Sequence, residues 1–194
     1  PQRHQPERDR SLRDLRGDWN FLMSLAAAIQ WECRSTGSSE NGGGYKAGAT
    51  GVDYSQQDAH QLSLTDLATS GAGSTTLTSV TGGFTAAMIG NVIYIRSGTN
   101  FTVGYYEITA RTDTNTVTLD RTPTAGGAGS SGAGKVGGAL DHPVRIIDDN
   151  NSTLRVVAGN TVWVKAATYN TADYMWWDID GGAATPIRVE GYTP

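Results

Sequence analysis

From residue 31 onward, short runs that mix apolar and polar residues recur along the chain, separated by glycine, asparagine and aspartate. This pattern predicts short strands joined by turns. Residues 84–89 indicate one helical turn, and residues 56–70 indicate one or two short helical turns around Leu62, Leu64 and Leu67. We therefore expect an all-β fold: a barrel, a sandwich or a β-helix. The predicted strands are residues 75–80, 91–96, 104–110, 116–119, 144–147, 154–157, 161–165, 175–179 and 186–189.

Composition supports this fold class and excludes several functions. Glycine supplies 25 of the 194 residues, and charged residues make up only 18 %. The net charge of −4 argues against a nucleic-acid binder that relies on overall charge. A single cysteine, Cys33, excludes an internal disulfide framework and a cysteine-rich zinc site. No apolar run reaches the roughly 18 residues of a membrane-spanning helix, so we expect no membrane association.

Changes in composition divide the chain into four segments. Residues 1–22 form a basic N-terminal arm, since residues 1–18 hold five arginines against four acids. Residues 23–124 are expected to form a small β-rich domain, and residues 125–138 a Gly/Ala/Ser linker. Residues 139–194 are expected to begin a short or truncated β-helix, because apolar strands at 162–164 and 187–189 repeat at solenoid spacing. We expect the chain to be one piece of a longer product, or to have a processed N-terminus.

Several stretches resemble a known family. Residues 159–169, Gly-Asn-Thr-Val-Trp-Val-Lys-Ala-Ala-Thr-Tyr, resemble the first coil of right-handed parallel β-helix proteins, and residues 186–192 resemble the next coil. Residues 23–31, 41–45, 51–57, 98–121 and 137–140 resemble the N-terminal region of β-helix-containing decoration and spike proteins of tailed bacteriophages. Two departures stand out: Ala167 occupies a position where the family usually has glycine, and the resemblance does not extend to residues 1–22.

The resemblance implies a non-enzymatic structural protein on the surface of the phage particle. Its expected role is attachment to a capsid or tail surface as a decoration, cement or spike component. Expected partners are other virion proteins, such as major capsid or tail proteins, and further copies of the chain, with a homotrimer as the expected form. The alternative is the N-terminal head of a tailspike that binds or degrades host surface glycans, with the active part beyond this chain.

From the sequence we predict no catalytic residues, no cofactor site and no metal site. Residues 129–135 fit the first seven positions of a phosphate-binding loop, but Val136 stands where Mg²⁺ requires a hydroxyl, and the following glycines are poor helix material. His4, His60 and His142 show no metal-ligand spacing. Asp178 and Asp180 would share one strand face, whereas glycosidase acids flank a bond from two sides, so a turn is the simpler interpretation.

Two groups of residues are candidates for interactions. The first is a docking arm, in which arginine forks would pair with an acidic partner and apolar side chains would be buried beside them. It comprises Arg8, Arg10, Arg13, Arg16, Trp19, Phe21 and Leu22. The second is an aromatic group that we interpret as core or subunit interface, with a glycan-binding platform as the alternative. It comprises Trp163, Tyr169, Tyr174, Trp176 and Trp177.

Overall fold

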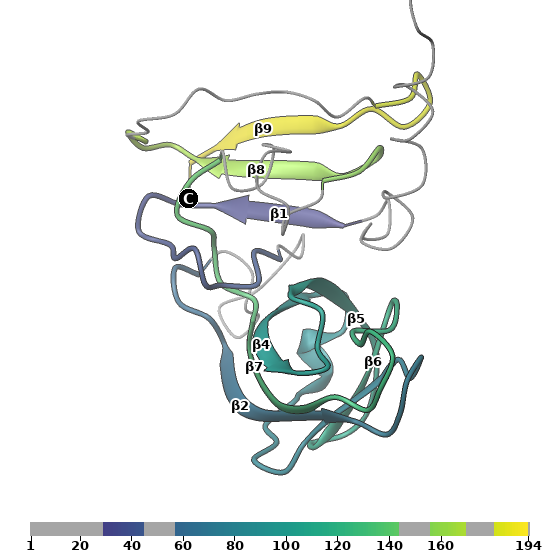
Figure 1. Cartoon of the computed structure of the whole chain (residues 1–194). Helices are drawn as coiled ribbons and strands as arrows, with labels where there is room; N and C mark the ends of the chain where they lie inside the picture. The colour runs from purple at the N-terminus through teal and green to yellow at the C-terminus, as the bar shows by residue number, and fades with distance from the viewer. Residues whose placement is uncertain (1–28, 45–56, 144–155, 170–180, 194) are drawn as a thin grey trace, which may run out of the picture.

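The computed structural model describes residues 29–44, 57–143, 156–169 and 181–193. These residues form a closed six-stranded barrel and a separate three-stranded parallel sheet (Figure 1). The all-β prediction is confirmed, and among the alternatives the middle of the chain is a barrel. The strands are β1 (Gln30–Cys33), β2 (Leu62–Thr69), β3 (Thr76–Ser79), β4 (Val92–Thr99), β5 (Gly104–Asp113), β6 (Thr116–Leu119), β7 (Ser130–Val136), β8 (Thr161–Lys165) and β9 (Arg188–Tyr192).

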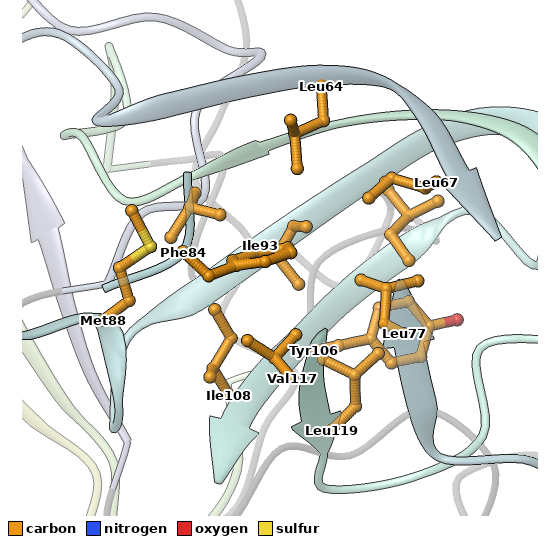
Figure 2. Close-up of a cluster of buried hydrophobic side chains, with 12 residues drawn as sticks. Leu64, Leu67, Leu77, Phe84, Met88, Ile93, Tyr106, Ile108, Val117 and Leu119 are labelled. Carbon is orange, nitrogen blue, oxygen red and sulfur yellow. The ribbon is translucent and has the colours of Figure 1, made fainter. Parts of the chain in front are cut away.

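The barrel closes through antiparallel neighbours in the order β2-β3-β6-β5-β4-β7. In β4, β5 and β6, buried residues two positions apart point into the lumen, which is the expected behaviour of a pleated strand in a small barrel. The lumen is filled by a cluster of apolar residues rather than open (Figure 2). Its members are Leu64, Leu67, Leu77, Phe84, Met88, Ile93, Ile95, Tyr106, Ile108, Val117, Leu119 and Val136.

The helical turns expected in residues 56–70 are wrong for residues 62–69, which form β2. Leu64 and Leu67 are both buried, and a spacing of three is typical of a helix face. In the barrel, a shift of register between these two leucines in the pairing of β2 with β7 lets both point inward. The helical turn expected at residues 84–89 is confirmed as a short 3-10 helix, η3 (Ala86–Met88).

The linker expected at residues 125–138 is wrong for residues 130–136, which form β7 and close the barrel between β2 and β4. The glycines of β7 are needed for close packing. A Cβ on Gly132 would lie 2.6 Å from Cε2 of Phe101 and 2.8 Å from Cβ of Leu67. A Cβ on Gly134 would lie 2.9 Å from the Tyr94 carbonyl oxygen. Neighbouring side chains and backbone therefore fill the space that a side chain at Gly132 or Gly134 would occupy.

The parallel sheet has the order β1-β8-β9. Gln30 pairs with Thr161 and Thr161 pairs with Arg188, so all three strands run in the same direction in register. The barrel is therefore inserted between two adjacent strands of the sheet. The domain expected at residues 23–124 is therefore wrong in its bounds. β1 pairs with β8 outside that range, and the barrel needs β7, which also lies outside it.

Several predictions lie outside the described residues. They are the arm at residues 1–22, the strands at 144–147 and 175–179, and residues 154–155 of the strand expected at 154–157. Residues 156–157 of that expected strand are described and are not in a strand. The β-helix also stays a prediction: the described residues contain the parallel sheet, and the sheet alone does not define a helical coil.

Candidate functional site

The barrel and the sheet meet at a junction of backbone hydrogen bonds. The Glu32 amide donates to the Gly43 carbonyl at 2.7 Å, and the Gly43 amide donates to the Gly138 carbonyl at 2.9 Å. The adjoining Gly137 amide donates to the Val92 carbonyl of β4, also at 2.9 Å. Such a continuous ladder fixes the position of the barrel on the sheet, since each bond satisfies a buried backbone group.

Apolar packing joins the same two parts. Trp31 of β1 lies edge-on to Tyr105 of β5, with ring centroids 5.5 Å apart, and Tyr94 of β4 stacks on Tyr105 at 4.3 Å. Trp31 is fully buried, and its indole Nε1 donates to Oδ1 of Asn160 at 3.1 Å. The apolar face of β1 and β8 is thus covered by the outside of the barrel wall.

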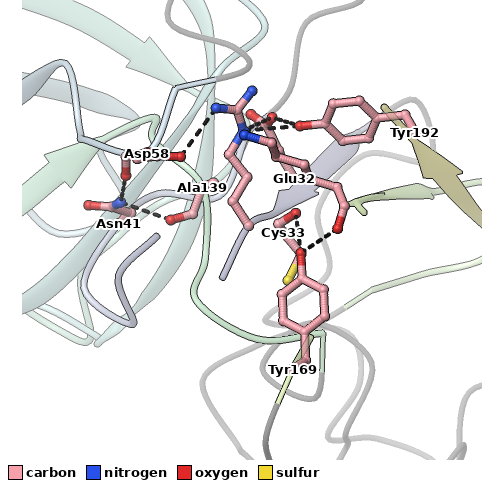
Figure 3. Close-up of polar contacts among 9 residues, drawn as sticks. Glu32, Cys33, Asn41, Asp58, Ala139, Tyr169 and Tyr192 are labelled. Atoms are coloured by element: carbon pink, nitrogen blue, oxygen red, sulfur yellow. Dashed lines mark hydrogen bonds and ion pairs between the residues drawn. The ribbon is translucent and has the colours of Figure 1, made fainter. Parts of the chain in front are cut away.

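The opposite face of β1 carries a polar cluster, which we call the junction cluster: Glu32, Arg34, Asp58 and Tyr192 (Figure 3). Glu32 and Arg34 are buried, whereas Asp58 and Tyr192 are partly exposed. Arg34 Nε lies 2.8 Å from Oε1 of Glu32, and Arg34 Nη1 lies 3.2 Å from Oδ1 of Asp58. Arg34 Nε also donates to the Tyr192 hydroxyl at 3.0 Å, and that hydroxyl donates to Glu32 Oε1. The cluster therefore links β1, the segment before β2 and β9.

Asn41 extends the cluster toward the barrel. Its Nδ2 donates to the carbonyl oxygens of Asp58 and Ala139, both at 2.8 Å. These bonds hold the segment before β2 against the segment that follows β7. The side chain is buried, so its donors depend on these two acceptors rather than on water.

Burial sets the electrostatics of the junction cluster. Glu32 is 0 % exposed and Arg34 is 8 % exposed, so each charge depends on its partner for solvation. Burial, followed by the hydrogen bond to the Glu32 carboxylate, raises the pKa of Tyr192 well above its usual range. The phenol is therefore protonated at neutral pH and is available as a donor to Glu32.

Cys33, the last residue of β1, lies between Glu32 and Arg34 in the sequence and points to the other face. It is fully buried, and burial raises the pKa of its thiol to about 12. A thiol in this state is a poor nucleophile at neutral pH, because the thiolate is the reactive form. Beside it, the Tyr169 hydroxyl lies 2.7 Å from the Lys165 carbonyl oxygen and 3.2 Å from that of Cys33, joining the ends of β8 and β1.

The structure separates the two described members of the aromatic group. Tyr169 packs against the apolar cluster between sheet and barrel, as a core interpretation predicts. Trp163 is half-buried on the polar face of the sheet, where its Nε1 donates to Oε1 of Gln30 at 2.8 Å. Its ring lies edge-on to Tyr192, with centroids 6.4 Å apart. Tyr174, Trp176 and Trp177 lie outside the described residues.

Some of the remaining candidate residues lie outside the described parts of the chain, and others lie within them. Arg8, Arg10, Arg13, Arg16, Trp19, Phe21, Leu22, Asp178 and Asp180 lie outside the described residues. The segment that resembled a phosphate-binding loop lies largely in β7, where Lys135 pairs with Glu40 at 2.6 Å. His142 contacts the ring of Tyr169 edge-on at 5.7 Å.

The sequence pattern alone did not predict the junction cluster. A signal was present: apolar and charged residues alternate from Trp31 through Glu32 and Cys33 to Arg34, and in an extended chain this spacing places both charges on one face. Their partners could not be found this way, because Asp58 is 24 residues from Arg34 and Tyr192 is 158 residues from it.

Within the described parts of the chain, no group of three or more His, Cys, Asp or Glu side chains is arranged to hold a metal ion. No helix in those parts is long and apolar enough to cross a membrane. Comparisons with protein-family models, with curated proteins and with solved structures find no match to this chain.

Proposed function

We propose that this chain is a non-enzymatic structural protein on the surface of a tailed-phage particle, attached to the capsid or tail as a decoration, cement or spike component. The observation that carries the proposal is the in-register parallel pairing of β1, β8 and β9, with a closed barrel inserted between the first two. This arrangement is what a β-helix with a small carried domain requires, and it agrees with the resemblance in residues 159–169 and 186–192.

In this proposal, β1, β8 and β9 are equivalent strands of successive coils of a short right-handed β-helix. Thr161 pairs with Arg188, so one coil spans 27 residues, within the range of solenoid repeats. Trp31, Val162 and Val189 occupy the same position in the three strands and share the apolar face. A parallel crossover between neighbouring strands is right-handed in almost every known case.

The junction cluster supports a mechanical role rather than catalysis. Arg34 is surrounded by Glu32, Asp58 and Tyr192, and the shared hydrogen bonds hold the sheet to the barrel. A catalytic acid or base near neutral pH would need a pKa close to that pH. The Tyr192 phenol is shifted in the opposite direction, and Arg34 remains charged at any pH of interest.

Attachment to the particle is assigned to the arm at residues 1–22, with Arg8, Arg10, Arg13 and Arg16 pairing with acidic groups of a capsid or tail protein. The test is binding of purified full chain to particles emptied of it, read as occupancy by cryo-electron microscopy. Deletion of residues 1–22 should abolish binding while circular dichroism shows an intact β fold. Full occupancy by the deleted form would overturn this assignment.

A matched pair of variants separates charge from geometry in the arm. Replacing all four arginines by alanine should weaken binding, and replacing them by lysine should restore part of it, since lysine keeps the charge but loses the bidentate fork. Equal binding by both variants and by the unchanged chain would exclude the arginines as the attachment residues.

Glycan binding by a tailspike head is a second candidate, favoured by the position of Trp163. The ring stands on the polar face of the sheet, and its register neighbour on β9 is Glu190. An aromatic ring flanked by polar groups suits a sugar. Titration calorimetry with host surface glycans tests this candidate: binding that Trp163→Ala removes would support it, and no heat of binding would exclude it.

A further inference from the structure

β9 has one paired edge and one free edge in the described part of the chain. It pairs with β8 on one side, and no described strand pairs with its other side (Figure 1). The Arg188 amide donates to the Asn160 carbonyl at 3.0 Å, and the Tyr192 carbonyl accepts from the Ala166 amide at 2.9 Å. Because backbone groups alternate in direction along a strand, those of Val189 and Gly191 face away from β8. They form an edge that can accept another strand.

The two charges on β9 are complementary under a two-fold axis. Arg188 and Glu190 are two residues apart, so both project from the face opposite Val189. Neither has an ion-pair partner among the described residues. If two copies of β9 pair antiparallel with Val189 opposite Val189, then Arg188 of each copy faces Glu190 of the other. Opposite charges across a strand pair stabilise it.

The neighbouring two-fold register is disfavoured by the same side chains. Centring the pair on Glu190 would place the two Glu190 carboxylates directly opposite each other, and like charges in that position destabilise the pair. The register centred on Val189 also aligns its outward amide and carbonyl groups with those of the second copy. The charge pattern therefore favours the register centred on Val189 over the register centred on Glu190.

Apolar burial favours the same arrangement. Val162, on β8, is 0 % exposed, whereas Val189 in the equivalent position of β9 is 46 % exposed. The apolar face of the sheet thus continues to its free edge without a cover in the described residues. In the two-fold pair, the two Val189 side chains stand side by side at the centre and bury each other.

We propose that two copies of this chain associate through antiparallel pairing of β9 with β9, in the register that opposes Arg188 to Glu190 of the second copy. Each copy uses its free edge once, so association through this edge closes at a dimer. The expected homotrimer would need other surfaces. The inference is independent of the proposed virion role, which a dimer neither requires nor excludes.

The first test is sedimentation equilibrium of the full chain and of its charge variants. The unchanged chain should form a species of twice the 20.5 kDa chain mass at micromolar concentration. Arg188→Glu and Glu190→Arg should each weaken the dimer by roughly tenfold or more, and the double exchange should restore it. A monomeric or trimeric unchanged chain, or single reversals without effect, would overturn the proposal. Arg188 is exposed and Glu190 is partly exposed, and circular dichroism checks that their substitutions leave the fold unchanged.

The second test reads the register by disulfide trapping. In the proposed register, positions 188 and 190 of different copies are directly opposite, at a separation suited to a disulfide. Mild oxidation of mixed Arg188→Cys and Glu190→Cys chains should give the mixed disulfide, whereas Glu190→Cys alone should stay reduced. Rapid cross-linking of Glu190→Cys alone would show the other register and contradict the proposal. Cys33 is fully buried and does not compete.

Discussion

Arg34 Nε lies 2.8 Å from Oε1 of Glu32, in a buried ion pair between Glu32 of β1 and Arg34, the residue that follows the strand. The Glu32 side chain is 0 % exposed and that of Arg34 is 9 % exposed. The pair sits where the sheet meets the barrel, and Asp58 and Tyr192 complete its hydrogen bonding. Buried charges of this kind are sensitive to the loss of one partner, because the other is left unsolvated.

Arg34→Met should lower the free energy of unfolding by about 3–5 kcal/mol, since it leaves the Glu32 carboxylate buried without a counter-charge. The measurement is urea unfolding followed by fluorescence. Arg96→Met is the matched control: Arg96 pairs with Glu40 at 2.9 Å, but both side chains are more than a third exposed. That change should remain within about 1 kcal/mol. Equal losses in both variants would contradict a special role for burial.

Leu77→Ala should lower the free energy of unfolding by about 2–5 kcal/mol, because it opens a cavity in the filled lumen of the barrel. Leu77 is 0 % exposed and contacts the other members of the lumen cluster. Val80→Ala, three residues away and 91 % exposed, should change stability by less than about 0.5 kcal/mol. Thermal unfolding by calorimetry compares the two, and similar losses would argue against a packed lumen.

Gly138→Ala should destabilise the protein by at least about 1 kcal/mol more than Gly73→Ala. Both glycines have positive φ, +77° for Gly138 and +74° for Gly73, so both substitutions carry the same backbone strain. A Cβ on Gly138 would lie 2.6 Å from the His60 backbone nitrogen, whereas a Cβ on Gly73 would meet nothing within 4 Å. Equal unfolding midpoints for the two variants would show that the backbone around Gly138 can shift to accommodate a Cβ at little energetic cost.

The Cys33 thiol should not react with a disulfide reagent in the native protein at pH 8. Burial raises its pKa to about 12 and removes the side chain from solvent. In urea above the unfolding transition, one thiol per chain should react rapidly. Labelling of the native protein at the unfolded rate would contradict the buried position of β1.

Low pH should lower the free energy of unfolding partly through protonation of Asp66. The Ser79 hydroxyl donates to its carboxylate at 2.5 Å and the Thr81 amide at 2.7 Å, and these bonds hold the pKa of Asp66 below 3.8. A depressed folded pKa means that the stabilisation is present above pH 3.8 and is lost as the pH falls through the folded pKa. Asp66→Asn should therefore flatten the acid limb of stability against pH. Because Asp66 is partly exposed, the effect should be small.

Much of the fold could be predicted from the sequence. The all-β class, the 3-10 turn near Met88 and the strands β3 to β6, β8 and β9 follow from local alternation of apolar and polar residues and from turn residues between them. Such signals are local, because the two-residue period of a strand can be seen in consecutive residues of the sequence.

β2 and β7 required the tertiary structure. The spacing of Leu64 and Leu67 becomes a strand pattern only because the register shifts between them in the pairing with β7. The glycines of β7 are typical of a linker until Phe101 and Leu67 are seen to fill the space beside Gly132. In both cases the deciding contact comes from a distant strand.

By itself, the sequence determined the all-β class, the approximate position of most strands outside β1, β2 and β7, and that Cys33 has no disulfide partner within the chain. Only the tertiary structure decided that the strands close into a barrel, that β1 pairs with β8 across it, and that Arg34 meets Asp58 and Tyr192. The physical reason is that strand propensity arises from neighbouring residues, whereas strand partners and buried charge pairs depend on which distant segments can bury their surfaces and satisfy their hydrogen bonds together.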